Sequence, residues 1–122
     1  MGATAPIRSS RSLTWAAETD LATALGHVET ISPRLLVVDS VQTLASAEVE
    51  GSAGGVTQVR EVAASLIAAA KKRNMTTLLV GHVTKDGSIA GPRLLEHLVD
   101  VVCQFEGEKN SRIRLLRAVK NR

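Results

Sequence analysis

The chain has 122 residues and a mass of 12.9 kDa, which limits it to one domain. With 44% hydrophobic and 22% charged residues it falls in the globular range, and its longest apolar runs are too short for a transmembrane helix. The net charge is unevenly distributed, because residues 1–59 carry −3 and residues 60–122 carry +6. A basic half favours phosphate-bearing partners, although a solvated surface with a charge bias accounts for it equally well.

The sequence contains one cysteine, Cys103, which excludes an internal disulfide and a zinc site built on cysteines. Its apolar surroundings predict an inert thiol in the core. This cysteine usage favours a reducing cytoplasm. Aromatic residues make up only 2% of the chain, which argues against recognition of single-stranded nucleic acid by base stacking.

The N-terminal third contains a lead-in, a short strand and a helix. Residues 1–12 are predicted to be a disordered lead-in to a domain that covers residues 13–122, and residues 13–16 form a weak strand candidate. Apolar residues recur at helical spacing over 21–31, with Thr19 as the expected N-cap and Ser32-Pro33 as the stop.

The middle of the chain predicts a parallel βαβ arrangement. Leu35 to Val38 is a continuous apolar run, typical of a strand covered on both faces. A polar, glycine-rich loop at 46–55 precedes a helix with a basic C-terminal end and Asn74 as its C-cap. One apolar stripe marks the inner face of this helix: Val59, Val62, Leu66, Ile67 and Ala70.

The remaining predicted elements are a buried strand at 76–80, a loop at 85–92, a short helix at 93–97 and two strands at 99–105 and 112–119. Early helices alternate with apolar strands, and a strand pair closes the chain. The expected fold class is therefore α/β, with a parallel sheet flanked by helices and a C-terminal antiparallel strand pair.

Asp39 follows the first buried strand, where α/β sheets bind ligands. In nucleotide hydrolases this is the Walker B position, whose carboxylate holds Mg²⁺. Taken alone the pattern is weak, since a structural acid is common there. The glycine-rich phosphate loop ending in Gly-Lys-Ser/Thr is missing: residues 51–55 lack the lysine, and residues 81–88 have it in the wrong place.

His82 follows the second buried strand and can sense a γ-phosphate, or it is merely hydrogen-bonded at a strand end. The loop after it places small residues between Lys85 and Arg93, the profile of a phosphate-contacting segment. A Ser40, His82 and Asp39 set would suit nucleophilic catalysis, but no Gly-x-Ser-x-Gly sequence accompanies it.

Three segments occur together in a recognisable order: Leu36-Val37-Val38-Asp39-Ser40-Val41-Gln42-Thr43, residues 80–97 (Val-Gly-His-Val-Thr-Lys-Asp-Gly-Ser-Ile-Ala-Gly-Pro-Arg-Leu-Leu-Glu-His), and Arg117-Ala118-Val119-Lys120-Asn121-Arg122. From about Trp15 to Arg122 the chain resembles the RadA (Sms) family of bacterial DNA-repair ATPases, which are RecA-like motors. In this resemblance the three segments are similar to the Walker B segment, the sensor strand with its DNA-facing loop, and the approach to a Lys-Asn-Arg-Phe-Gly signature.

The resemblance implies a partial RecA-like core and assigns roles to matching residues. Asp39 and Ser40 would bind ATP, Asp39 would hold Mg²⁺, and His82 would stand at the catalytic sensor position. Lys85 and Arg93 would bound the DNA-facing loop, while Lys120 and Arg122 would reach a neighbouring subunit's nucleotide or DNA. Implied partners are single-stranded or branched DNA, the RecA recombinase and further copies in a homo-hexamer, in the bacterial cytoplasm.

Parts of that family's pattern are missing from these 122 residues: the four-cysteine zinc finger, the phosphate loop and the Lon-protease-like domain. The chain by itself is therefore expected not to hydrolyse ATP. Three alternatives stay open: a non-catalytic DNA-binding or ring-interacting module, a poorly folded remnant, and a RecA-like ATPase of the replicative-helicase or clock type, which residues 81–97 fit less well.

Overall fold

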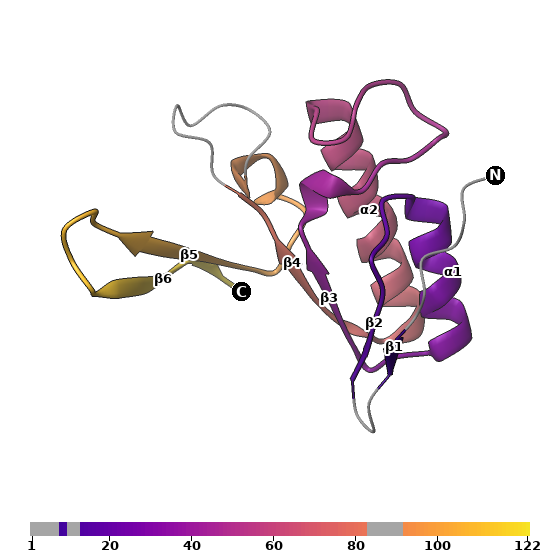
Figure 1. Ribbon diagram of the computed structural model, residues 1–122, viewed down its shortest axis with the longest axis horizontal. Coiled ribbons are helices and arrows are strands. Elements are labelled where there is room, and N and C mark those ends of the chain that lie inside the picture. Colours follow the sequence, from indigo (N-terminus) through magenta and orange to yellow (C-terminus); the bar gives the residue numbers. More distant parts are fainter. Residues whose placement is uncertain (1–7, 10–12, 83–91) are drawn as a thin grey trace.

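A computed structural model describes residues 8–9, 13–82 and 92–122 (Figure 1). The elements in chain order are β1 (Arg8–Ser9), β2 (Thr14–Trp15), α1 (Leu21–Ile31), β3 (Leu35–Asp39), the 3₁₀ turn η1 (Val41–Thr43), α2 (Val56–Arg73), β4 (Thr76–Val80), the 3₁₀ turn η2 (Pro92–Leu95), β5 (Val101–Gly107) and β6 (Arg114–Asn121). Most of the predicted lead-in lies outside the described residues, but β1 falls within it and pairs with β2.

Helix α1 is capped by a different residue from the one expected. Asp20, not Thr19, is the N-cap: its carboxylate accepts hydrogen bonds from the Thr23 backbone N–H at 2.9 Å and from the Thr23 hydroxyl at 2.8 Å. The prediction of Thr19 is therefore wrong by one residue; both residue types are good caps, and the local geometry selects Asp20. Ser32 ends the helix in the left-handed conformation, as the stop signal before Pro33 predicts.

Strands β3 and β4 form a parallel pair, in register from Leu35 opposite Thr76 to Asp39 opposite Val80. Leu36 and Val38 face the hydrophobic core, whereas Val37 and Leu78 on the other face are each more than half exposed. The expectation that this strand is covered on both faces is therefore wrong within the described residues. The helices lie on one side of the pair, and only that side is packed (Figure 1).

The core is built mainly on α2, as its apolar stripe predicts. Val59, Val62 and Leu66 are almost completely buried, and Asn74 caps the helix in the left-handed conformation. Side chains from α1, from η1 and the residue after it, and from η2 complete this cluster: Leu21, Val41, Leu44 and Leu95. Burial of each of these large aliphatic side chains contributes roughly 1.5–3 kcal/mol to the stability of the fold.

The glycine-rich loop before α2 is tied down by one buried amide. Gln58 accepts a hydrogen bond from the Ser46 N–H at 2.8 Å. Its amide nitrogen donates to the carbonyl oxygens of Ser46 at 3.0 Å, Val49 at 2.9 Å and Gly51 at 3.2 Å. Because Gln58 itself is 1% exposed, these bonds replace water for both the side chain and the loop backbone.

Strands β5 and β6 form an antiparallel pair that extends away from the helices (Figure 1). Cys103 lies in β5 but is exposed, so the prediction of a core thiol is wrong. The strand itself is confirmed, but nothing among the described residues covers this stretch. Together the parallel pair, its helices and this hairpin confirm the predicted α/β class.

No helix in the described part of the chain is long and apolar enough to cross a membrane.

Candidate functional site

The strongest candidate site lies where β3 and β4 end. Asp39 is the last residue of β3, and His82 comes two residues after β4. Because the strands are parallel and in register, both side chains come to the same edge of the sheet. The His82 Nε2 lies 3.9 Å from the Asp39 Oδ1, and both side chains are 69% exposed. The pair is therefore open to a ligand at the edge where α/β sheets bind one.

A side-chain amide holds the backbone beside this pair. Gln42, in η1, donates from Nε2 to the His82 carbonyl oxygen at 2.9 Å, and its Oε1 accepts from the His82 N–H at 3.1 Å. These two hydrogen bonds act like one more step of sheet pairing beyond Val80. Gln42 therefore fixes the residue after β4 relative to the segment after β3. No local pattern in the sequence marks Gln42, because its partner is 40 residues away.

Ser40 is 2% exposed, so its side chain lies below the surface that Asp39 occupies. Its hydroxyl is fully buried and has no hydrogen-bond partner among the described residues. An orphaned buried hydroxyl next to an exposed carboxylate fits a site that a further polar group completes. The peptide bond between Asp39 and Ser40 is cis.

Asp39 could supply one carboxylate ligand to Mg²⁺. Within residues 8–9, 13–82 and 92–122 no group of three or more His, Cys, Asp or Glu side chains could hold a metal by itself. A single exposed carboxylate matches the usual protein contribution to Mg²⁺ sites, in which phosphate oxygens and waters supply the other ligands. The site therefore fits a metal that arrives with a phosphate compound.

The predicted DNA contacts are only partly described. Lys85 lies outside the described residues. Arg93 lies in η2, with its backbone described but not its side chain. Their predicted role in DNA binding stays a prediction.

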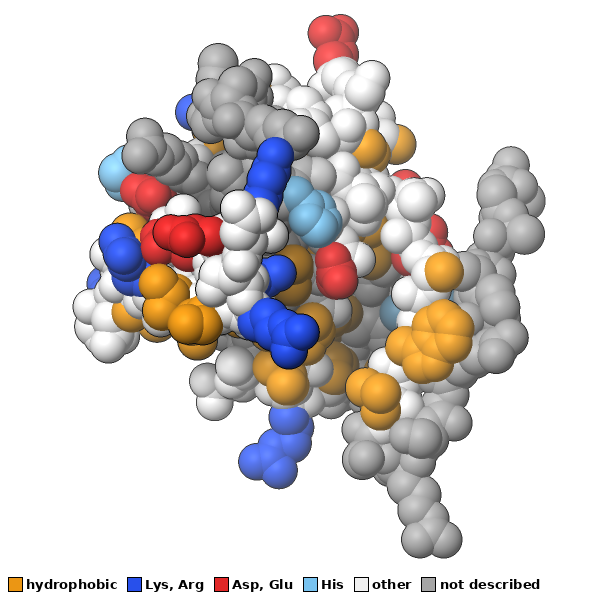
Figure 2. Space-filling view, turned by 60° about the vertical axis from the view of Figure 1, so that its left-hand side comes forward, with side chains coloured by type: hydrophobic (Ala, Val, Ile, Leu, Met, Phe, Trp, Pro, Cys, Tyr) orange, Lys and Arg blue, Asp and Glu red, His pale blue; other side chains and the backbone are white. Residues whose placement is uncertain are grey.

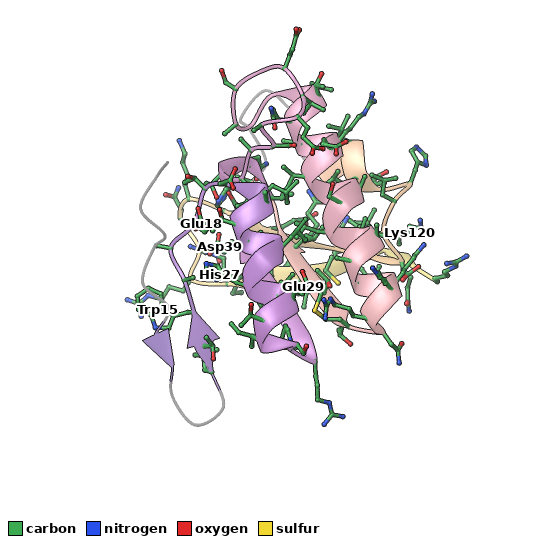
Figure 3. All side chains as sticks on the ribbon, turned by 90° about the vertical axis from the view of Figure 1, so that its right-hand side faces the viewer. Trp15, Glu18, His27, Glu29, Asp39 and Lys120 are labelled. Carbon is green, nitrogen blue, oxygen red and sulfur yellow. The ribbon has the colours of Figure 1, made fainter. Side chains whose placement is uncertain are left out.

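The two C-terminal cations contact their own chain. Lys120 donates from Nζ to the carbonyl oxygens of Glu96 at 2.8 Å and Val99 at 2.9 Å, and it is partly buried. Arg122 pairs with Asp100 at 3.0 Å, with side chains 78% and 69% exposed. Both cations therefore contact the connection between η2 and β5, and Figure 3 shows Lys120 well separated from Asp39. The structure brings Asp39 and His82 together but does not bring Lys120 to them.

The exposed surface around the hairpin combines charge with apolar groups. Figure 2 shows basic, acidic and histidine side chains on this face, with hydrophobic side chains between and below them. The apolar members on the hairpin are Val101, Phe105, Ile113, Leu115, Leu116 and Val119, all at least half exposed.

Fold and site together define an α/β protein with a parallel strand pair whose carboxyl edge presents a carboxylate and a histidine. No protein-family model matches the chain. It is 59% identical to DNA repair protein RadA of Mycobacterium tuberculosis over 107 residues, which is 88% of the chain and 22% of that relative. The RadA protein of Mycolicibacterium smegmatis is 59% identical over 88% of the chain and 24% of the relative.

DNA repair protein RadA of Streptococcus pneumoniae is 53% identical over 87% of the chain and 25% of the relative. The chain therefore belongs to the RadA family, as the three sequence segments predicted. It spans 22–25% of the length of these curated relatives.

Proposed function

We propose that the chain acts in DNA repair in the bacterial cytoplasm, as the part of an ATP-dependent motor that carries the metal-binding acid, the sensor residue and a DNA-contacting segment. The observation that carries this proposal is the Asp39–His82 pair, 3.9 Å apart at the carboxyl edge of parallel strands. Support comes from relatives named DNA repair protein RadA over 87–88% of the chain. The motor would promote branch migration in homologous recombination, on single-stranded or branched DNA.

Within this proposal each residue at the edge has one task. Asp39 offers an exposed carboxylate to Mg²⁺, whereas the Ser40 hydroxyl lies buried beside it and would contact ATP only once the site opens around it. The bound metal would neutralise charge on the β- and γ-phosphates of ATP. His82 lies beside the carboxylate and can donate a hydrogen bond to a phosphate oxygen, while Gln42 holds its backbone in place.

The remaining proposed contacts are made with a neighbouring subunit or with DNA. Arg122, with a side chain 78% exposed, can reach a neighbouring subunit's nucleotide or DNA in a homo-hexamer, giving up only an exposed ion pair. Lys85 and Arg93 would contact DNA phosphates, and the RecA recombinase would act alongside the assembly. Because the 122 residues contain no phosphate-loop motif, the chain alone is not expected to turn over ATP.

Paramagnetic line broadening by Mn²⁺-ATP tests the metal site without requiring turnover. We expect selective broadening of backbone amide signals near Asp39 and His82, since Mn²⁺ accepts the same oxygen ligands as Mg²⁺. Asp39→Asn should remove most of it, whereas Glu29→Gln, a change at an exposed acid on α1, should not. Equal broadening in Asp39→Asn would contradict the assignment. Robust Mg²⁺-dependent ATP hydrolysis by the chain alone, assayed with single-stranded DNA, would contradict its catalytic incompetence.

A second candidate function is a non-catalytic DNA-binding or ring-interacting module, favoured by the +6 charge of residues 60–122. A salt titration of single-stranded DNA binding separates the possibilities. The module is favoured if the logarithm of the DNA affinity falls linearly with the logarithm of the salt concentration and Mn²⁺-ATP has no effect at Asp39. An absence of binding even at low salt would contradict a DNA-contacting role for this chain.

A further inference from the structure

Lys120 is turned to one side by an irregularity in the last strand pair. Cys103 pairs with Ala118, whereas the preceding residue of β5, Val102, pairs with Lys120. Strand β6 therefore contains one extra residue at Val119, which is a β-bulge. Directly paired residues share a face of the sheet and successive residues alternate, so the bulge places Lys120 on the face opposite that of Ala118.

On that face the Lys120 ammonium meets two backbone carbonyls. Its Nζ donates to the Glu96 oxygen at 2.8 Å and to the Val99 oxygen at 2.9 Å. Between them, the Leu98 N–H closes a turn on the Leu95 carbonyl oxygen at 2.9 Å. A cation at the carbonyl end of a turn satisfies oxygens that the turn leaves unpaired, and bonds with a charged donor are the stronger kind.

Arg122 is held to its own chain more weakly than Lys120 is. Its ion pair with Asp100 is 3.0 Å long, but both side chains are more than two-thirds exposed. Exposed ion pairs contribute little to stability and are screened by salt. Lys120 is instead partly buried and commits two of its three N–H groups to backbone oxygens.

We propose that Lys120 is a positioning residue that fixes the connection at 96–100 to the last strand, in place of the partner-contacting role that the resemblance assigns to it together with Arg122. The role of Lys120 follows from its contacts within this chain. The role of Arg122 rests on the proposed function.

Amide hydrogen exchange tests the positioning role. In Lys120→Met, which keeps the apolar stem and removes the charged donor, we expect protection of the Leu98 amide to fall on the order of tenfold. Lys120→Arg should restore most of the protection, because a guanidinium can donate to both carbonyls. The Ser32 amide, which bonds to Val28 at the end of α1, serves as the internal control. Unchanged protection at Leu98, or an equal loss at Ser32, would overturn the proposal.

The salt dependence of single-stranded DNA binding tests the division between the two cations. Loss of one phosphate contact lowers the slope of log affinity against log salt concentration by about 0.7. We expect that reduction in Arg122→Gln and no reduction in Lys120→Met; Lys72→Met, at an exposed position near the end of α2, controls for loss of a charge. A reduced slope in Lys120→Met with unchanged Leu98 exchange would overturn the proposal. If the wild-type chain does not bind DNA, the proposed function fails, and Leu98 exchange alone decides the role of Lys120.

Discussion

Gln42 links the segments that follow β3 and β4 through a single side chain. Its amide bonds to both backbone polar groups of His82, so the imidazole is carried on a backbone that cannot rotate independently of η1. Asp39 is fixed by strand pairing, but His82 lies beyond the last pair of the ladder. The spacing between the two side chains therefore depends on this amide.

Removing the Gln42 amide should release His82. In Gln42→Ala, which removes both hydrogen bonds to His82, we expect the His82 amide to exchange roughly twofold to tenfold faster, because its N–H loses one neutral hydrogen bond. Gln42→Glu keeps the oxygen that accepts from His82 N–H and should show a smaller effect. Exchange measured by NMR, with a core amide of α2 as the reference, checks this prediction; equal exchange in all three proteins would contradict it.

Asp20 supports α1 only while it is ionised. Hydrogen bonds from the Thr23 hydroxyl and, second, from the Thr23 backbone N–H lower the pKa of its carboxyl below the ordinary 3.8. A lowered folded-state pKa adds stability above pH 3.8, and this stability is lost as the pH falls through the folded value. We expect Asp20→Ala to have a lower Tm at pH 7, with a difference that disappears in strong acid. Asp20→Asn, which caps without a titrating group, should have a Tm between the two at pH 7 and should not share the acid-dependent loss in a thermal melt.

At the scale of single residues, the sequence predicted which side chains lie at the sheet edge better than it predicted the contacts that hold residues in place. Asp39 and His82 could be placed at one sheet edge, because the parallel arrangement brings the carboxyl ends of both strands together. The prediction of Thr19 as the cap is wrong by one residue, since neighbouring residues of similar propensity compete through local geometry. The contacts of Gln42 and Lys120 depend on tertiary structure and leave no periodic signal.

Among the elements, the loop between η1 and α2 is ordered by the helix that follows it. Gln58 lies in the first turn of α2 and bonds back to the backbone at Ser46, Val49 and Gly51. The start of the loop is held by the backbone bridge between Ala45 and Asp20, and the part from Ser46 to Gly51 depends on the Gln58 amide.

Gln58→Met should therefore destabilise the fold. It fills a similar volume but leaves the buried Ser46 N–H and the nearby carbonyls unpaired, at a cost of about 2–3 kcal/mol. Gln58→Glu keeps the acceptor for Ser46 N–H but places a carboxylate against carbonyl oxygens, so it should also be destabilised. The free energy of unfolding in urea measures both, and Gln104→Met, the same change at an exposed position of β5, is the matched control. A wild-type value for Gln58→Met would contradict this account.

Element positions were predictable where periodicity was strong. The expected strand at 76–80 coincides with β4, and the predicted apolar stripe of α2 is buried except at Ile67, which is half-buried. The two last strands are each shifted by two residues toward the C-terminus at their start, to Val101 and Arg114. In a hairpin whose apolar residues are exposed on both faces, no single face determines the register.

Over the residues that the structure describes, the molecule has one packed side and one open side. The helices cover one face of the β3–β4 pair, while Leu35, Val37 and Leu78 on the other face are each more than half exposed. Sequence alone predicted a sheet covered on both faces, because continuous apolar strands normally are. The exposure of this face could not be predicted from the strand residues, because their apolar pattern is the same whether or not another element packs against them.

This open face should make the chain self-associate. Several large apolar side chains side by side exceed what a monomer commonly exposes, so we expect a concentration-dependent increase in apparent mass by light scattering. The double variant Val37→Thr, Leu78→Thr keeps strand propensity and should shift the increase to higher concentration with little change in Tm. An apparent mass independent of concentration in the wild type would contradict the prediction.

The β5–β6 hairpin, which extends away from the helices, is expected to unfold separately from the packed part of the chain. Its strands pair mainly with each other, and large side chains such as Phe105 and Leu116 are exposed rather than shared with the core. A two-stranded hairpin with little packing is marginally stable, so it opens at a lower free energy than the β3–α2–β4 unit. We therefore expect the hairpin and the β3–α2–β4 unit to open at different free energies, with Lys120 joining β6 to the connection that lies between them in the chain.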